Sequence, residues 1–363
     1  MLYYIFCYLD KISTISQFKI FKYLNFRLFG IATTSFLICL FAYPYTINKL
    51  KNLKIKQITR IDGPEMHFKK NNTPTMGGII IFLSVFVSTM LWAKLNNRFI
   101  IWFLIGSVWF TFLGFCDDYL KIKKKNVKGL SKKCKLFWQS AFSILLSIYL
   151  FFYPQNHEFV TSISIPFFKN IIVNIHYLYA LLVIIIIAGS SNAVNLTDGL
   201  DGIAAWNVVI AVFTLSVFAY LSGNIYISKH LYIINVVGSE EISIFLFAII
   251  GSCLGFLWYN SYPADIFMGD TGSLFLGGIL GMTSIFIKQE IILILIGGIF
   301  FIEALSVLIQ IFYYKKTKKK IFKMAPIHHH FEMLGISETK ITIRFLIAGI
   351  IFSIFSIISL KPR

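Results

Sequence analysis

Two adjacent carboxylates, Asp117 and Asp118, end an apolar stretch that reads VWFTFLGFCDDYLK over residues 108–121. A charged side chain costs roughly 2.5–3.5 kcal/mol at the centre of a membrane helix, and less near its end. The pair would also lie at a helix C-terminus, where the helix dipole disfavours negative charge. A divalent cation would offset both costs, and so would neutralisation by Lys121 and Lys123–Lys125. Because adjacent helical residues point about 100° apart, we expect the two carboxylates to differ in role.

Two further acidic motifs precede apolar stretches. Asp-Gly pairs at the start of a helix can be ordinary caps and turns, and they can equally form a pocket of backbone amides for a phosphate or a base edge. Glycines beside an aspartate allow a close backbone approach that a plain cap does not need. An exposed Phe267 would stack on a base or belong to an interfacial aromatic belt. The motifs are SNAVNLTDGLDG (191–202), with Asn192, Asp198 and Asp201, and NSYPADIFMGDTGS (260–273), with Asn260, Phe267 and Asp270.

A run of three histidines, His328–His330, lies in the segment MAPIHHHFE (324–332). Consecutive side chains of a regular backbone point in different directions, so the three make a poor tridentate metal site. With Mg²⁺, which prefers oxygen ligands, imidazole would serve better as a donor to phosphate oxygens. Glu303 lies inside an apolar stretch, which makes it a functional candidate by default. A buried pairing with Gln310 or Ser306 is the alternative.

The stretches that carry these residues are long enough to cross a bilayer. The chain has 363 residues, of which 57% are hydrophobic, and its mean hydropathy is +0.75. Runs of about 18–25 apolar residues recur along it. This pattern predicts an all-α polytopic membrane protein that forms a single domain over residues 1–363, without a signal peptide and without a disulfide framework among its five cysteines. We expect about ten spans, near 29–48, 77–93, 99–116, 136–153, 171–190, 203–221, 243–259, 272–287, 291–313 and 341–360.

The positive charge of the chain is concentrated in three connections. Of the 34 Lys and Arg, seven lie in 49–70, eight in 121–135 and eight in 315–344, while the alternate connections carry one or two each. By the positive-inside rule these three segments face the cytoplasm, and the net charge of +18 therefore does not indicate nucleic-acid binding. Every polar motif above then falls on the cytoplasmic face, including TPTMGG (73–78). We expect them to line one cytoplasm-facing cleft, and both termini to lie outside.

Several aspartates, lysines and helix N-termini in one place suit Mg²⁺-assisted chemistry on a phosphate. The sequence contains no Walker-type loop, so a nucleotide would be a substrate and not a source of energy. Transfer of a sugar phosphate from a nucleotide diphospho-sugar to a lipid phosphate breaks one pyrophosphate bond and makes another. Such a reaction needs no other energy source.

The motifs TPTMGG, FCDDYLK, NAVNLTDGLDG, FMGDTGS and APIHHHFE, in this order, resemble the phospho-N-acetylmuramoyl-pentapeptide-transferase family. This family is part of the polyprenyl-phosphate N-acetylhexosamine-1-phosphate transferase superfamily. The likeness extends from about Phe26 to Arg363. Residues 71–72, Asn-Asn, depart from the more basic or Gly-containing pair that we expect there. The acidic motifs indicate the superfamily, and TPTMGG and PIHHHFE indicate the muramoyl branch.

The resemblance implies that the substrates are UDP-N-acetylmuramoyl-pentapeptide and undecaprenyl phosphate, that the products are lipid I and UMP, and that Mg²⁺ is the cofactor. It implies a bacterial inner-membrane protein with its site on the cytoplasmic face; a homodimer is compatible with it. By the same likeness, Asp270 binds the metal, Asp117 lies nearest the lipid phosphate as its base, and Asp118 supports the metal or lysine network. It also implies three groups of binding residues. The donor phosphates would be bound by Lys70, Thr75, Asn192, Asp198, Asn260, His328, His329 and His330, and the uridine by Gly199, Leu200, Asp201 and Phe267. The lipid phosphate would be bound by Lys121 and Lys135.

Two alternatives remain open from the sequence. A transferase that uses UDP-N-acetylglucosamine would share the acidic motifs, and a donor-competition assay would distinguish it. A transporter would place charged groups at mid-bilayer depth and on both faces. The apolar spans contain one such group near their middle, Glu303, which favours an enzyme.

Overall fold

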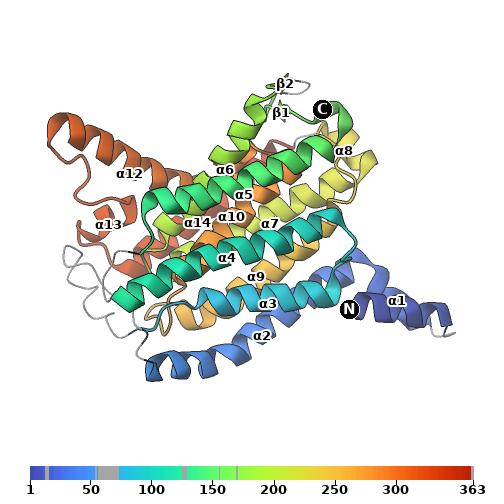
Figure 1. Cartoon of the computed structure of the whole chain (residues 1–363), viewed down its shortest axis with the longest axis horizontal. Coiled ribbons are helices and arrows are strands. Elements are labelled where there is room, and N and C mark those ends of the chain that lie inside the picture. Colours follow the sequence, from blue (N-terminus) through green and yellow to red (C-terminus); the bar gives the residue numbers. More distant parts are fainter. Residues whose placement is uncertain are drawn as a thin grey trace.

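The computed structural model describes residues 1–12, 16–53, 55, 73–124, 129–154, 156–168 and 171–360 of the chain, and it is almost entirely helical (Figure 1). The elements are α1 (Leu2–Ile12), the 3₁₀ helix η1 (Ser16–Lys22), α2 (Leu24–Asn52), α3 (Gly78–Trp92), α4 (Arg98–Lys124), α5 (Lys132–Phe152), the 3₁₀ helix η3 (His157–Phe159), β1 (Ser162–Ser164), β2 (Ile172–Asn174), α6 (Leu178–Thr197), α7 (Ile203–Gly223), α8 (Ile225–Leu231), α9 (Glu240–Asn260), α10 (Gly269–Phe286), α11 (Ile292–Ile296), α12 (Gly298–Thr317), α13 (Ile327–Glu332) and α14 (Glu338–Ile358).

The all-α polytopic fold predicted from hydropathy is confirmed. Eight of the described helices are long and apolar enough to cross a membrane: α2, α4, α5, α6, α7, α9, α12 and α14. The two other predicted spans, 77–93 and 272–287, correspond to α3 and α10. Helix α3 has 15 residues. Helix α10 has 18, and all of its residues from Thr271 to Phe286 are buried inside the protein.

Helix α10 lies in the centre of the bundle, packed against α4, α6 and α3 (Figure 1). Its glycines let neighbouring helices approach closely. A methyl group added at Gly278 would lie 2.7 Å from the Phe110 ring on α4, and one at Gly277 would lie 2.5 Å from the Ser190 carbonyl oxygen on α6. Because glycine has no Cβ, the backbone of α10 can fit where a larger residue would separate the helices.

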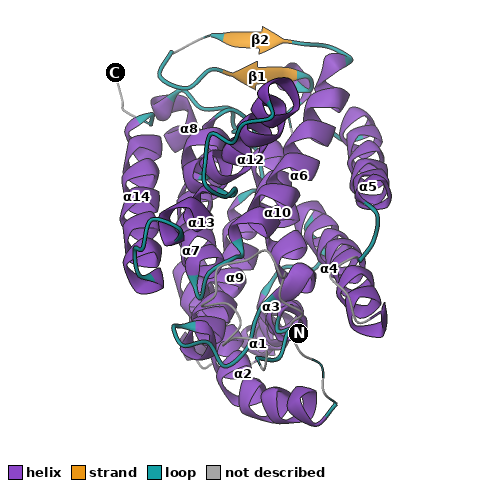
Figure 2. Cartoon of the chain, turned by 90° about the vertical axis from the view of Figure 1, so that its left-hand side faces the viewer, coloured by secondary structure: helices purple, strands orange, loops and turns teal. Residues whose placement is uncertain are grey.

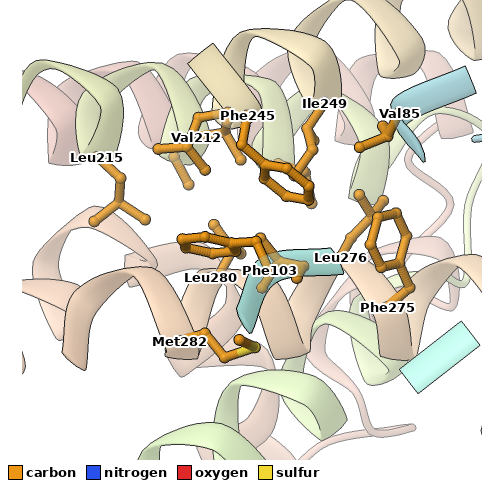
Figure 3. Close-up of a cluster of buried hydrophobic side chains, with 14 of the residues drawn as sticks. Val85, Phe103, Val212, Leu215, Phe245, Ile249, Phe275, Leu276, Leu280 and Met282 are labelled. Carbon is orange, nitrogen blue, oxygen red and sulfur yellow. The ribbon is translucent and has the colours of Figure 1, made fainter. Parts of the chain in front are cut away.

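The apolar core joins α10 to α4, α7 and α9. Figure 3 shows Phe103 of α4 beside Phe245 of α9, and the two rings stack with centroids 4.8 Å apart. Leu276 and Leu280 of α10 face this aromatic pair, and all four side chains are buried. Such packing fixes the position of α10 along α4, and with it the distance between the N-terminal end of α10 and the C-terminal end of α4.

Two predicted spans differ in detail from the structure. The expected span 171–190 begins only at Leu178, because residues 172–174 form β2, which pairs antiparallel with β1 as Ser162↔Asn174, Ile163↔Val173 and Ser164↔Ile172 (Figure 2). The expected span 291–313 is divided at Gly297 into the short α11 and the longer α12. Two consecutive glycines, each costing about 1 kcal/mol in a helix interior, explain the break.

Buried charges at the end of the bundle opposite the acidic motifs are paired. Arg27 of α2 donates to both oxygens of Glu241 on α9, at 2.7 and 2.6 Å. Lys288, after α10, donates to the Val160 carbonyl oxygen at 2.7 Å and so fastens the loop before β1. Burial lowers the pKa of Lys288 to about 8, and the nearby Glu290 opposes this shift. The pairing of Arg27 explains how a basic residue is accommodated at the end that the positive-inside rule assigns to the outside.

Candidate active site

The paired aspartates meet the third acidic motif where α4 ends, α5 begins and α10 begins. Asp117 and Asp118 lie on the last turns of α4, and Asp270 lies on the first turn of α10. One carboxylate oxygen from each of the three lies within 4.8 Å of the others. The structure therefore brings together two motifs that are separated by about 150 residues in the sequence.

Two lysines bridge these carboxylates. Lys121, one turn after Asp117, places Nζ 2.6 Å from Asp117 Oδ2, 3.7 Å from Asp118 Oδ1 and 2.9 Å from Asp270 Oδ1. Lys135 of α5 places Nζ 2.5 Å from Asp270 Oδ2 and 3.1 Å from Asp117 Oδ2. Lys121 thus neutralises the carboxylates as expected, and the second cation beside them is Lys135. Lys123 and Lys124 are exposed, and Lys125 lies outside the described residues. We call Asp117, Asp118, Asp270, Lys121 and Lys135 the carboxylate–lysine cluster.

The carboxylate of Asp118 caps helix α10. Its Oδ2 accepts from the Thr271 amide at 2.9 Å and from the Thr271 hydroxyl at 2.7 Å, and its Oδ1 accepts from the Asp270 amide at 3.2 Å. These are the amides that a helix start leaves without partners, and its dipole favours a negative charge there. The dipole at the start of α10 favours the Asp118 charge and therefore offsets the unfavourable dipole at the end of α4.

The carboxylate of Asp117 points elsewhere. Its Oδ1 accepts from the Leu130 amide at 2.6 Å, in the loop between α4 and α5. A methyl group added at Gly129 would lie 2.3 Å from the same oxygen. Apart from Lys121, which contacts both, the adjacent aspartates have separate partners, as the 100° turn between them predicts. Gly129 and Leu130 were not identified from the sequence.

The TPTMGG segment packs against the start of α10. The amides of Gly77 and Gly78 donate to the carbonyl oxygens of Phe267 and Met268, at 2.8 and 2.9 Å. A methyl group at Gly78 would lie 2.1 Å from the Gly272 nitrogen. Thr75 is half-buried, and its hydroxyl lies 3.1 Å from the position of a Cβ built on Gly269. This places Thr75 beside the cluster. The predicted Lys70 and the unusual pair at 71–72 lie outside the described residues.

The turn after α6 approaches the cluster through Asp198. This residue ends α6 and is half-buried. Burial, together with the carboxylates of Asp270, Asp118 and Asp201, raises the pKa of Asp198 to about 7. Its carboxyl group therefore gains from any cation that enters the cluster.

Asp201 and Asn260 hold loops together. Asp201 Oδ2 accepts from the Ala264 amide at 3.0 Å, and its own amide donates to Glu338 Oε1 at 2.7 Å. Asn260 Oδ1 accepts from the Gly202 amide at 2.9 Å, while its Nδ2 donates to the Ile266 carbonyl oxygen at 2.8 Å. Both side chains are nearly fully buried. Glu338 was overlooked in the sequence, although an acid in the first turn of a span is a common cap signal.

Asn192 is tied to α5 by a polar residue that sequence reasoning also missed. Asn192 Nδ2 donates to Gln139 Oε1 at 2.8 Å, and Gln139 Nε2 donates to the Ser191 hydroxyl at 3.2 Å. Gln139 is fully buried. An uncharged polar residue within a predicted span could have indicated this contact.

The three histidines of α13 have three different neighbours. His328 is fully buried, with Nδ1 3.0 Å from Glu303 Oε1. His329 Nδ1 lies 2.7 Å from Glu332 Oε2, and His330 Nδ1 accepts from the Lys323 amide at 3.2 Å. The expectation that they do not converge on one metal agrees with this geometry.

Two expectations about side chains are wrong. Glu303 does not pair through its carboxylate with Ser306 or Gln310. The Ser306 hydroxyl donates to the Glu303 backbone oxygen, and Gln310 bonds to the backbone of Ile321 and Phe322. The reason is that α13 folds back and presents His328 to α12. Phe267, expected to be exposed, is half-buried, because its backbone is paired with the TPTMGG segment.

The cluster has the donor set that a hard cation requires. Carboxylate oxygens are the protein ligands that Mg²⁺ prefers, and this ion commonly takes only one or two of them together with phosphate oxygens and water. Lys121 Nζ already lies within 3.7 Å of all three carboxylates, so a positive charge is favoured at this point. Asp270 is the least buried of the three, with 14% of its side chain exposed. The arrangement can bind a cation and anionic phosphates side by side.

Comparison with known proteins gives consistent matches over the whole chain. The glycosyl transferase family 4 model matches residues 100–288, and phospho-N-acetylmuramoyl-pentapeptide-transferase signature 1 matches residues 70–82. A protein of Endomicrobium trichonymphae named phospho-N-acetylmuramoyl-pentapeptide-transferase is 61% identical over 363 residues, which is 100% of both chains. Proteins of the same name from Desulfotalea psychrophila and Thermodesulfovibrio yellowstonii are each 47% identical; the alignments cover 97% and 96% of this chain and 97% of each relative.

Proposed function

This chain belongs to the phospho-N-acetylmuramoyl-pentapeptide-transferase family, and we propose that its carboxylate–lysine cluster is the centre at which the sugar phosphate is transferred. The reaction joins phospho-N-acetylmuramoyl-pentapeptide, from its UDP-linked donor, to undecaprenyl phosphate and gives lipid I and UMP. The observation that carries the assignment of the site is the meeting of Asp117, Asp118 and Asp270 with two lysines at one end of the bundle.

The bond changes balance without a further reactant. An oxygen of the acceptor phosphate attacks the phosphorus that bears the sugar, and the bond from that phosphorus to the oxygen bridging it to UMP breaks. One pyrophosphate linkage is lost and one is made. We propose that the transfer proceeds by direct attack of the lipid phosphate and not through a covalent aspartyl intermediate, which would balance equally. The protein must therefore position two anionic groups against each other and offset their repulsion.

Lys121 and Lys135 are suited to that task. Both ammonium groups contact carboxylates from two helices, which fixes their positions before substrate binds. We propose that they receive the phosphate of the lipid acceptor. Asp117 holds both lysines and is the carboxylate nearest that phosphate. A phosphate monoester loses its second proton near pH 6, so Asp117 is needed as a base chiefly below neutral pH.

Asp270, with support from Asp118, would hold Mg²⁺, and the bound ion would supply charge neutralisation for the donor diphosphate. The turn from Asp198 to Asp201, with Asn192, Thr75, Lys70 and Phe267, is proposed to hold the nucleotide and its phosphates. Asn260 and Asp201 contribute by fixing the two loops on which these groups lie. A homodimer would add nothing to the cluster itself, because its five members come from one chain.

The same proposal places the protein in the bacterial inner membrane with the cluster on the cytoplasmic face. In the chain, the basic connections at 49–70, 121–135 and 315–344 begin in the last turns of α2, α4 and α12, and the last turns of α4 carry Asp117 and Asp118 of the cluster. Cytoplasmic connections carry such an excess of Lys and Arg. A UDP-linked donor made in the cytoplasm would reach the cluster directly.

The test is release of UMP by the purified protein in detergent. UDP-N-acetylmuramoyl-pentapeptide and undecaprenyl phosphate are supplied with Mg²⁺ or with EDTA, and UDP-N-acetylglucosamine replaces the donor in a parallel assay. We expect UMP from the muramoyl donor alone, and only with Mg²⁺. UMP from the other donor alone would overturn the substrate assignment, and an unchanged rate in EDTA would overturn the metal.

A matched pair of variants tests the site itself. Asp270→Asn should reduce UMP release by at least about 100-fold, since it removes the carboxylate that faces both lysines. Asp265→Asn makes the same chemical change five residues earlier, on an exposed residue of the loop that precedes α10, and should retain the wild-type rate. Equal rates in the two variants would refute the assignment of Asp270.

A further inference from the structure

Glu303 and His328 form a fully buried pair outside the carboxylate–lysine cluster. Glu303 lies on α12 and His328 on α13, and neither is exposed to solvent. Their nearest polar atoms, Oε1 and Nδ1, are 3.0 Å apart. Within the described ranges neither oxygen of Glu303 accepts a hydrogen bond of regular geometry. A buried carboxylate without a partner costs several kcal/mol, so the imidazole is the group that makes Glu303 tolerable inside this helix.

The other edge of the His328 ring lies against the turn that follows α6. A methyl group added at Gly199 would be 2.2 Å from His328 Nε2. Gly199 directly follows Asp198, and its amide donates to the Thr197 carbonyl oxygen at 2.8 Å. The ring therefore occupies the space between a buried carboxylate on α12 and the tight turn at residues 197–199.

The direction of the ring depends on Glu303. A carboxylate beside Nδ1 favours the proton on that nitrogen, and this sets both the tautomer and the orientation of the imidazole. His329, its neighbour, has a separate carboxylate partner in Glu332 and does not compete for Glu303. Glu303 is thus placed to decide where His328 Nε2 points.

We propose that Glu303 is a positioning residue for donor binding: it holds the His328 ring against the turn at Asp198 and Gly199, and so fixes the part of the site that receives the uridine diphosphate end of the donor. The inference rests on the proposed function of the chain. It assigns a role to the acid inside α12, which lies outside the carboxylate–lysine cluster. Glu303 acts through His328 and touches no substrate itself.

A double-mutant cycle on UMP release tests this coupling. The four proteins are the wild type, Glu303→Gln, His328→Ala and the double variant, each assayed over a range of donor and of acceptor concentrations. We expect Glu303→Gln to raise the KM for the UDP-linked donor about tenfold, which is the lower end of the cost of removing a group that orients a metal-ligating histidine. The KM for undecaprenyl phosphate should stay within about twofold, because its proposed site is the two lysines. In the His328→Ala background, Glu303→Gln should change the donor KM by less than about twofold.

Ser306→Ala provides the matched control. Ser306 lies almost one turn further along α12, is also buried, and its hydroxyl donates to the Glu303 backbone oxygen at 2.7 Å. This substitution alters the same stretch of helix without removing the carboxylate. It should leave both KM values at the wild-type level.

Equal effects of Glu303→Gln in the two backgrounds would overturn the proposal, since Glu303 would then act independently of His328. An unchanged donor KM in the single variant, or equal rises in both KM values, would overturn it as well. If Glu303→Gln is not recovered as a folded protein, Glu303→Asp enters the same cycle, because it retains the charge and withdraws it from Nδ1. Failure of the wild type to release UMP would refute the proposed function instead, so the two failures are distinguishable.

Discussion

Removal of the Asp118 carboxylate is expected to destabilise the start of α10, and this can be measured separately from catalysis. The carboxylate accepts two amides and one hydroxyl from Asp270 and Thr271, at 2.7–3.2 Å. Only 3% of Asp118 is exposed, so water cannot easily replace it. A hydrogen bond to a charged group contributes about 1.5–3 kcal/mol, and loss of a helix cap costs about 0.5–2 kcal/mol.

The individual contributions overlap and cannot simply be added. For Asp118→Ala, which leaves three buried donors without an acceptor, we expect a loss of about 3 kcal/mol in the free energy of unfolding. Asp118→Asn keeps one carbonyl oxygen and should lose about 1–2 kcal/mol. Thr271→Val removes only the hydroxyl contact and should lose about 1 kcal/mol. The order of the three variants follows directly from the number of bonds that each one removes.

The assay is thermal unfolding of each variant in one detergent at one scan rate. UMP release is measured separately on unheated portions of the same preparations. At about 2–4 °C per kcal/mol, Asp118→Ala should lower the apparent Tm by about 6 °C or more. Thr271→Val should lower it further by less than about 1 °C when added to Asp118→Ala, because its acceptor is already gone. An apparent Tm of Asp118→Ala within about 1 °C of the wild type would refute the capping role.

Two further predictions concern the loops around the cluster. The pKa of Asp198 is raised to about 7, chiefly by burial and then by Asp270, so the folded protein binds this proton more tightly than the unfolded chain between about pH 4 and 7. The free energy of unfolding therefore falls as pH rises through that window. In Mg²⁺-free buffer, Asp198→Asn should raise the apparent Tm at pH 8 but not at pH 4. An equal rise in Tm at both pH values would contradict this. Gly78→Ala should abolish UMP release and lower the Tm, because its methyl group would lie 2.1 Å from the Gly272 backbone nitrogen; a wild-type rate and Tm would show that the contact is not required.

The sequence alone determined the class of the protein and the grouping of its polar motifs. In a bilayer, an apolar run of about 20 residues can satisfy the hydrogen bonds of its own backbone only as a helix. Hydropathy therefore located most spans directly. The alternation of basic and neutral connections then placed Asp117, Asp198 and Asp270 on one face before any contact was known. The family resemblance rests on the same motifs, and full-length relatives confirm it.

Hydropathy could not foresee the local departures. Residues 171–177 are apolar enough to extend a span, and only their pairing with β1 assigns part of them to a strand. The span at 291–313 reads as continuous, although Gly297 divides it.

Which polar residue meets which was decided only by the tertiary structure. The sequence offered the lysines after Asp118 as neutralising groups, and Lys121 takes that place. Packing of α4 against α10 also turned the Asp118 carboxylate to the start of α10, and it brought Lys135 from α5 to Asp270. In the same way, the return of α13 onto α12 gave Glu303 a histidine partner. The reason is physical: helical periodicity fixes which side chains share a face, whereas the neighbour of that face is set by the packing of distant helices.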